Sequence, residues 1–274
     1  EWAGDETEEQ EQEETGSTRH WGRKDQKAML GVFAQFQNPR VLYKATEVYQ
    51  ALLNLLTNGD NEIQKSTLKA ILAWKTPSVI KYQEHLLNFL DDARFREEVS
   101  VFLRLEEEGD AIRSADCPEL MPVLLRILYG KAVTRAGSAS GKRGQQTRRK
   151  AIFVALARFP ADIVGQFLSI SLGSLATMEP IQDGELNQSA LDKFAVAPRK
   201  QVGLLNMLDD MVHTLGNRLD RYATKIADAV LLCLLKASKS HTGFIDTDEE
   251  APVEEESQTS LDRAIRQAGF HCLI

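Results

Sequence analysis

Apolar residues recur at helical spacing along most of this chain. Between residues 39 and 57 they follow one another at intervals of three and four, which places a single apolar stripe on one helix face: Leu42, Ala45, Val48, Tyr49, Leu52, Leu53 and Leu56. No segment shows sustained strict alternation of apolar and polar residues between turn residues, so the pattern predicts no sheet.

Turn residues divide the pattern into separate helices. In Asn58-Gly59-Asp60, the glycine suits a left-handed cap and the aspartate suits the first residue before a new helix. Thr76-Pro77 opens another helix, and Gly216 ends a later one. Helices are therefore expected near residues 27–36, 39–57, 61–74, 77–90, 91–105, 120–130, 145–159, 160–175, 202–215 and 219–235, with one more beginning near 260.

The order of these helices predicts the fold class. They come in pairs separated by short turns, at a loose period of roughly 35 to 45 residues, which is typical of an α-solenoid of HEAT or armadillo-like helical pairs. Helices of this length are marginal alone in water, so stacking must supply the stability, with each buried Leu or Ile contributing about 1.5–3 kcal/mol. The sequence predicts an all-α protein.

Charge and composition divide the chain further. Residues 1–22 are predicted to be an acidic disordered segment, 23–238 the HEAT-like solenoid, 239–258 an acidic linker and 259–274 the truncated start of a further helix. The chain lacks an initial methionine and stops within an apolar run, so it is expected to be part of a longer protein.

Two further features concern the cellular environment. The three cysteines are too few and too scattered for a disulfide framework, and Cys233 lies in an apolar run where a reduced, buried thiol is expected, so a reducing compartment follows. The apolar runs are too short or too polar for a bilayer, which needs about 20 residues, so no membrane association is expected.

The sharpest chemical signal is a basic Gly/Ser loop expected at residues 131–150. The chain has a net charge of −7, yet this segment holds no acidic residue. Its basic residues are Lys131, Arg135, Lys142, Arg143, Arg148, Arg149 and Lys150. No aromatic residue is interleaved with them, so base stacking is not implied and contact with RNA phosphates is the functional interpretation. A solvated loop and a nuclear import signal are the alternatives.

The sequence predicts no catalytic chemistry. The five histidines stand in unrelated contexts, without the spacing of paired metal ligands. Asp209 and Asp210 point about 100° apart on a helix and do not face each other. Gly137-Ser138-Ala139-Ser140-Gly141-Lys142-Arg143 fails as a phosphate-binding loop, because its glycines are separated by three residues and Arg143 stands where Ser or Thr would bind magnesium. The expected protein has no catalytic residue, metal, cofactor or small-molecule substrate, and it is not an enzyme.

Several segments, taken in order, form a recognisable series. The strongest is the segment before the basic loop, Leu124-Leu125-Arg126-Ile127-Leu128-Tyr129-Gly130-Lys131. The flanking segments are Asn38-Pro39-Arg40-Val41-Leu42-Tyr43-Lys44, Ile63-Gln64-Lys65-Ser66-Thr67-Leu68, Leu87-Asn88-Phe89-Leu90-Asp91-Asp92 and Gly203-Leu204-Leu205-Asn206-Met207-Leu208. This series resembles the DRIM (down-regulated in metastasis) family of very large HEAT-repeat proteins associated with the U3 small nucleolar RNA. The resemblance covers residues 36–237, and the acidic segments match nothing in it.

The resemblance implies a non-catalytic scaffold of the small-subunit processome in the nucleolus. Such a protein supports pre-ribosomal RNA processing and has pre-ribosomal RNA, U3 small nucleolar ribonucleoprotein (snoRNP) and processome proteins, and neighbouring HEAT repeats as partners. An armadillo-type solenoid that binds proteins or peptides in nuclear transport or regulation is the alternative. A peptide-binding armadillo groove carries a ladder of Asn and Trp, and Trp74 is the only Trp within the repeats.

Overall fold

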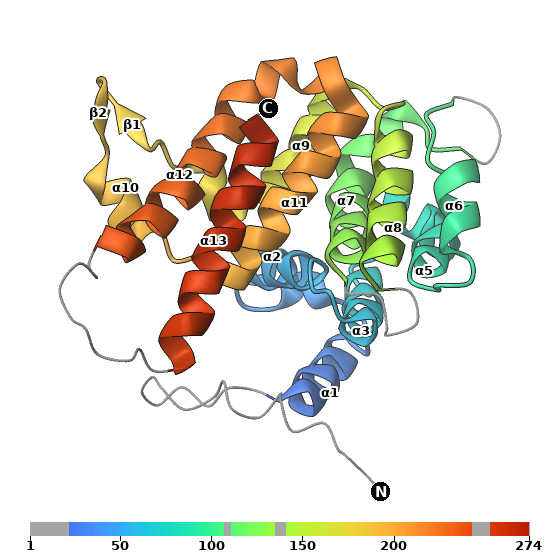
Figure 1. The fold of residues 1–274 in the computed structure, drawn as a ribbon. Coiled ribbons are helices and arrows are strands. Elements are labelled where there is room, and N and C mark those ends of the chain that lie inside the picture. Colours follow the sequence, from blue (N-terminus) through green and yellow to red (C-terminus); the bar gives the residue numbers. More distant parts are fainter. Residues whose placement is uncertain (1–21, 107–110, 135–140, 243–252, 274) are drawn as a thin grey trace, which may run out of the picture.

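The computed structural model describes residues 22–106, 111–134, 141–242 and 253–273, and within them the chain is built almost entirely of helices (Figure 1). The all-α, solenoid-like class predicted from the sequence is confirmed. The α-helices are α1 (Arg23–Phe33), α2 (Ala45–Leu55), α3 (Asn61–Leu72), α4 (Pro77–Lys81), α5 (Gln83–Phe89), α6 (Phe95–Val101), α7 (Cys117–Val133), α8 (Gly141–Leu156), α9 (Ala161–Leu172), α10 (Gln188–Lys193), α11 (Pro198–Leu215), α12 (Ala223–Thr242) and α13 (Val253–Leu273).

Short 3-10 turns connect several of the helices, and one connection forms a hairpin. The turns are η1 (Pro39–Val41), η2 (Ser114–Asp116), η3 (Gly173–Thr177) and η4 (Gly216–Tyr222). Strands β1 (Ile181–Gln182) and β2 (Glu185–Leu186) pair antiparallel around Asp183 and Gly184, which both have positive φ. The prediction of no sheet is wrong here, because two-residue strands are too short to show alternation.

The acidic segments fall largely outside the described residues. Residues 1–21 and 243–252 are not described, so the predicted disorder of residues 1–22 lies outside the structure except for Gly22. Of the predicted linker at 239–258, the described residues belong to helices, because α12 continues to Thr242 and α13 already begins at Val253.

Helix α7 is the central element of the fold. It contacts α2, α3, α4, α5, α8 and α9, and Figure 1 shows it beside α8 in the middle of the molecule. Its side chains are buried on nearly all sides, as expected for a helix that is apolar around its circumference. At Gly130 the helix approaches the α2–α3 turn so closely that a Cβ atom would collide with the side chain of Gln64. The Gln64 amide donates to the Leu56 carbonyl at 2.6 Å, which fixes this crossing.

Two helix boundaries differ from the sequence prediction, the first for a tertiary reason and the second for a local one. The helix expected at 77–90 breaks at Tyr82, whose hydroxyl donates to Asp116 Oδ2 at 2.8 Å and accepts the Arg113 amide at 3.2 Å. The helix expected from Asp91 begins at Phe95, because the Asp91 carboxylate accepts the Ala93 amide at 3.0 Å and holds a turn.

The cap predicted at Asp60 is confirmed, and it allows a first test. The Asp60 carboxylate accepts the amides of Glu62 at 2.9 Å and Ile63 at 3.4 Å. Asp60→Ala is expected to lower the free energy of unfolding by about 0.5–2 kcal/mol, because two amides at the start of α3 lose their acceptor. Urea denaturation followed by circular dichroism measures the loss. Asp60→Asn, which keeps a capping oxygen, is the control, and equal losses in both variants would contradict the assignment.

Helices α11, α12 and α13 pack together at the C-terminal side, with α13 against both others. Cys233 is fully buried as a free thiol, as predicted, and burial raises its pKa to about 12. Cys272 donates its thiol hydrogen to the Leu205 carbonyl at 3.1 Å, and burial raises its pKa to about 11. Both thiols are therefore protonated and weakly nucleophilic at neutral pH.

Candidate nucleic-acid interface

The basic segment is shorter as a loop than the sequence predicted. Helix α7 continues to Val133 and α8 begins at Gly141, so residues 131–133 and 141–150 are helical. Arg135 lies outside the described residues, and the side chains of Lys142 and Arg143 are not described. Three candidate residues besides Lys131 remain in view: Arg148, Arg149 and Lys150.

Lys131 is an internal residue rather than part of the surface. Its side chain is 1% exposed, and its ammonium group donates to Asp92 Oδ1 at 2.7 Å and to Asn61 Oδ1 at 3.4 Å. Burial lowers the pKa of Lys131, and the hydrogen bond that it donates to Asp92 opposes that shift. The hydrogen bond from Lys131 is in turn the main cause that lowers the pKa of Asp92. Lys131 therefore links α7 to the connection between α5 and α6, and its ammonium group is not available to bind phosphate.

Arg149 is likewise buried and joins three helices. Its Nε donates to the Ala132 carbonyl at the end of α7 at 3.0 Å, and one terminal nitrogen donates to Asp210 Oδ2 of α11 at 3.1 Å. The side chains of Arg149 and Asp210 are 7% and 17% exposed. Asp209 instead pairs with the exposed His213 at 3.1 Å, so the two neighbouring carboxylates serve different partners.

A signal for both buried cations was present in the sequence. Leu124, Leu128 and Lys131 follow one another at intervals of four and three residues, on the buried face of α7. Arg149 precedes Phe153 and Leu156 in the same way on α8. The periodicity therefore indicated internal positions, although it could not name Asp92 or Asp210 as their partners.

Arg148 and Lys150 are accessible but do not lie together. Arg148 is half-buried and donates to the Lys131 carbonyl at 3.4 Å, and its charge also contributes to the lowered pKa of Asp92. Lys150 is exposed and lines a hollow of about 730 Å³ between α8 and α11, beside Asp209 and Asp210. Two candidates thus flank the buried Arg149 on different sides of α8.

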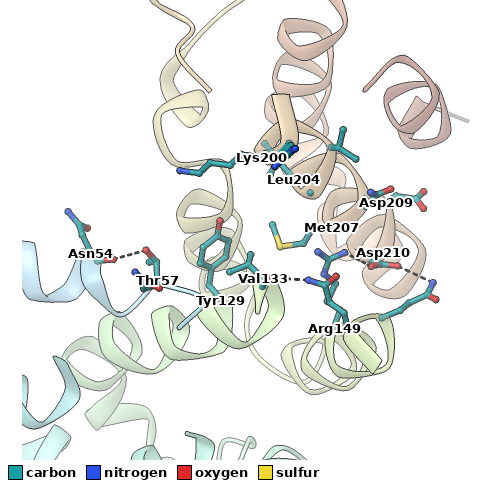
Figure 2. A pocket seen from close by; sticks show the side chains of 18 of the residues that line it. Asn54, Thr57, Tyr129, Val133, Arg149, Lys200, Leu204, Met207, Asp209 and Asp210 are labelled. Carbon is teal, nitrogen blue, oxygen red and sulfur yellow. Dashed lines mark hydrogen bonds and ion pairs between the residues drawn. The ribbon is translucent and has the colours of Figure 1, made fainter. Parts of the chain in front are cut away.

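A larger cleft of about 1190 Å³ lies between the α2–α3 turn, α7, α8 and α11 (Figure 2). Tyr129, Val133 and Met207 contribute its apolar surface, and Arg149 spans its lower side in the figure. Side-chain amides, two exposed cations and two carboxylates also line it: Asn54, Asn58, Gln145, Gln146, Asn206, Arg199, Lys200, Asp209 and Asp210. Such a lining offers hydrogen bonds and charges of both signs over an apolar floor.

The described ranges contain no grouping of metal ligands. Within them, no three His, Cys, Asp or Glu side chains are placed to hold a metal ion. Among the same residues, no helix has the length and apolarity that a membrane span requires.

Comparison with known proteins identifies the family. The family described as U3 small nucleolar RNA-associated protein 20, N-terminal, matches residues 20–274. The chain belongs to this family. U3 small nucleolar RNA-associated protein 20 of Saccharomyces cerevisiae is 27% identical over 257 residues, covering 93% of this chain and 10% of that protein. The protein of the same name from Schizosaccharomyces pombe is 29% identical over 218 residues, covering 78% of this chain and 9% of that protein.

Membership of the U3 small nucleolar RNA-associated protein 20 family confirms the resemblance drawn from residues 36–237. The match extends further, to residues 20–274, and so includes the second acidic segment and α13. The chain spans about a tenth of the length of the two yeast relatives.

Proposed function

We propose that this chain is part of a non-catalytic scaffold in ribosome biogenesis, a component of the small-subunit processome in the nucleolus that supports pre-ribosomal RNA processing. The observation that carries the proposal is the family match over residues 20–274, since the family is named for its association with the U3 small nucleolar RNA. The stacked helices support it, because such folds present extended surfaces to several partners at once. The partners proposed are pre-ribosomal RNA, U3 snoRNP and processome proteins, and neighbouring HEAT repeats.

The armadillo-type alternative predicts a tryptophan that faces a peptide-binding groove, and the position of Trp74 does not support it. Trp74 is 7% exposed and packs against Tyr49, with ring centroids 5.4 Å apart. A tryptophan that binds peptide in an armadillo groove must instead face the groove.

Within this function, we propose that the corner between α7 and α8 contacts RNA phosphates through five residues. These residues are Arg135, Lys142, Arg143, Arg148 and Lys150. Lys131 and Arg149 are left out, because each is buried against a carboxylate.

A charge-reversal variant tests this contact. Changing Lys142, Arg143, Arg148 and Lys150 to Glu is expected to weaken binding to pre-ribosomal RNA and to reduce the slope of log affinity against log salt by about 0.7–0.9 per lost phosphate contact. Filter binding across a salt series measures both quantities.

The control reverses four exposed cations elsewhere, namely Arg158, Lys193, Arg221 and Lys225. The control changes the net charge by the same amount as the first variant. A loss of RNA affinity confined to the first variant therefore supports the contact. Equal behaviour of the two variants would show that only overall charge matters, and the corner would then not be an RNA site.

A further inference from the structure

A second basic surface lies away from the α7–α8 corner, on the N-terminal helices. Residues 26–46 and 63–83 contain no acidic residue, although the chain as a whole has a net charge of −7. Together the two stretches carry seven cations: Lys27, Arg40, Lys44, Lys65, Lys69, Lys75 and Lys81. Three of them form ion pairs, Lys27 and Lys65 with Glu62 and Lys81 with Asp116. The helices formed by these stretches pack against each other, since α3 contacts both α1 and α2.

One hydrogen bond brings the exposed ends of the two stretches together. Arg40 in η1 donates its Nε hydrogen to the Trp74 carbonyl at 3.2 Å, and Lys75 is the next residue after Trp74. Arg40, Lys44 and Lys75 are all exposed. Three cations from two loops therefore lie on one part of the surface.

An exposed aromatic ring stands among these cations. Tyr43 is 87% exposed and Val41 is 77% exposed, which is unusual for residues of their size and apolarity. The ammonium group of Lys44 lies 5.8 Å from the centroid of the Tyr43 ring. Pro39 is buried beneath this turn.

The backbone at two of these three cations has an uncommon conformation. Lys44 has φ 56° and Lys75 has φ 50°, in the left-handed region that Gly, Asn and Asp occupy more readily than lysine. Lysine at both positions keeps two positive charges where a neutral residue would fit the backbone better. Glu47, in the first turn of α2, is the nearest acidic residue along the chain.

We propose that Tyr43 is a stacking platform for an unpaired base of RNA, and that Arg40, Lys44 and Lys75 bind the phosphates beside that base. An exposed ring on a basic part of the surface is the combination that single-stranded nucleic acid requires, because the base stacks on the ring and the backbone lies along the charges. The α7–α8 corner lacks aromatic residues and offers phosphate contacts alone, so the two surfaces differ in what they recognise. The proposal rests on the proposed function in assuming RNA as the partner.

The first test separates stacking from charge. Binding of the 274-residue chain to a mixed-sequence single-stranded oligoribonucleotide is compared with binding to its duplex. Tyr43→Ala is expected to weaken single-strand binding about ten- to hundredfold, the loss typical when one base loses its platform, and to leave duplex binding and the salt slope unchanged. Tyr43→Phe keeps the ring and is expected to bind like the wild type.

The second test concerns the phosphates. Lys44→Asn and Lys75→Asn remove charge while keeping residues that tolerate the left-handed backbone. Each is expected to reduce the salt slope for single-stranded RNA by about 0.7. Photo-crosslinking of a 4-thiouridine oligonucleotide, with peptide mapping, is expected to place a cross-link at Tyr43.

The outcomes distinguish this proposal from the proposed function. If Tyr43→Ala binds single strands like the wild type while charge reversal at the α7–α8 corner weakens binding, the platform is overturned and the RNA role stands; Val41 and Tyr43 would then be a protein contact. If the wild type binds neither form of RNA, both proposals fail.

Discussion

Asp210→Ala is expected to lower the free energy of unfolding by about 3 kcal/mol, because it leaves a buried cation without its partner. Arg149 is 7% exposed in its side chain, and Asp210 supplies the one carboxylate that the described residues place against it. The remaining hydrogen bond to the Ala132 carbonyl does not neutralise the guanidinium charge. Urea denaturation followed by circular dichroism measures the loss.

The neighbouring carboxylate provides a matched control. Asp209→Ala removes a pair with the exposed His213, which solvent screens, so a much smaller loss is expected. The double variant Arg149→Met/Asp210→Leu removes both charges and should recover most of the stability lost in Asp210→Ala. A loss in Asp209→Ala equal to that in Asp210→Ala would contradict the importance of the buried pair.

Phe167→Ala is expected to lower the free energy of unfolding by about 3–5 kcal/mol, because it deletes a fully buried ring at the junction of three helices. The Phe167 ring on α9 meets Tyr129 of α7 and Phe153 of α8 edge to face, with centroids 6.3 and 6.0 Å apart. Thermal and urea unfolding both report the loss.

Phe167→Leu is the corresponding control. It preserves most of the volume and is expected to cost clearly less than Phe167→Ala, because aliphatic filling leaves a smaller cavity. Equal losses for the two substitutions would show that the aromatic edges, rather than the filled volume, stabilise the junction.

Local signals in the sequence predicted two helix boundaries that short-range geometry sets, the start of α3 and the end of α11. Asp60 caps α3 through amides two and three residues away, and Gly216 ends α11 with φ 51°. The break at Tyr82 escaped prediction because its causes, Asp116 and Arg113, lie more than 30 residues along the chain. No local pattern encodes such a bond.

The candidate RNA interface likewise has features that the sequence shows and features that depend on packing between distant residues. The concentration of positive charge between residues 131 and 150 was visible in composition, but its separation into internal and external residues depends on packing. Arg149 pairs with a residue 61 positions away, and Lys131 with one 39 positions away. Tyr43 stands outside the apolar stripe predicted for residues 39–57, and it is exposed in the structure. The bond between Arg40 and the Trp74 carbonyl, which joins two basic stretches near it, spans 34 residues and no local pattern encodes it.

The hydrogen bonds of Arg149 also bear on how this region responds to force. One planar guanidinium group on α8 holds the end of α7 and the middle of α11, so sliding α11 past α7 must break at least one of its two hydrogen bonds. Helical stacks usually bend by small rotations between neighbouring layers. This joint should therefore be stiff under tension, and the cleft beside it should keep its width when the rest of an assembly flexes.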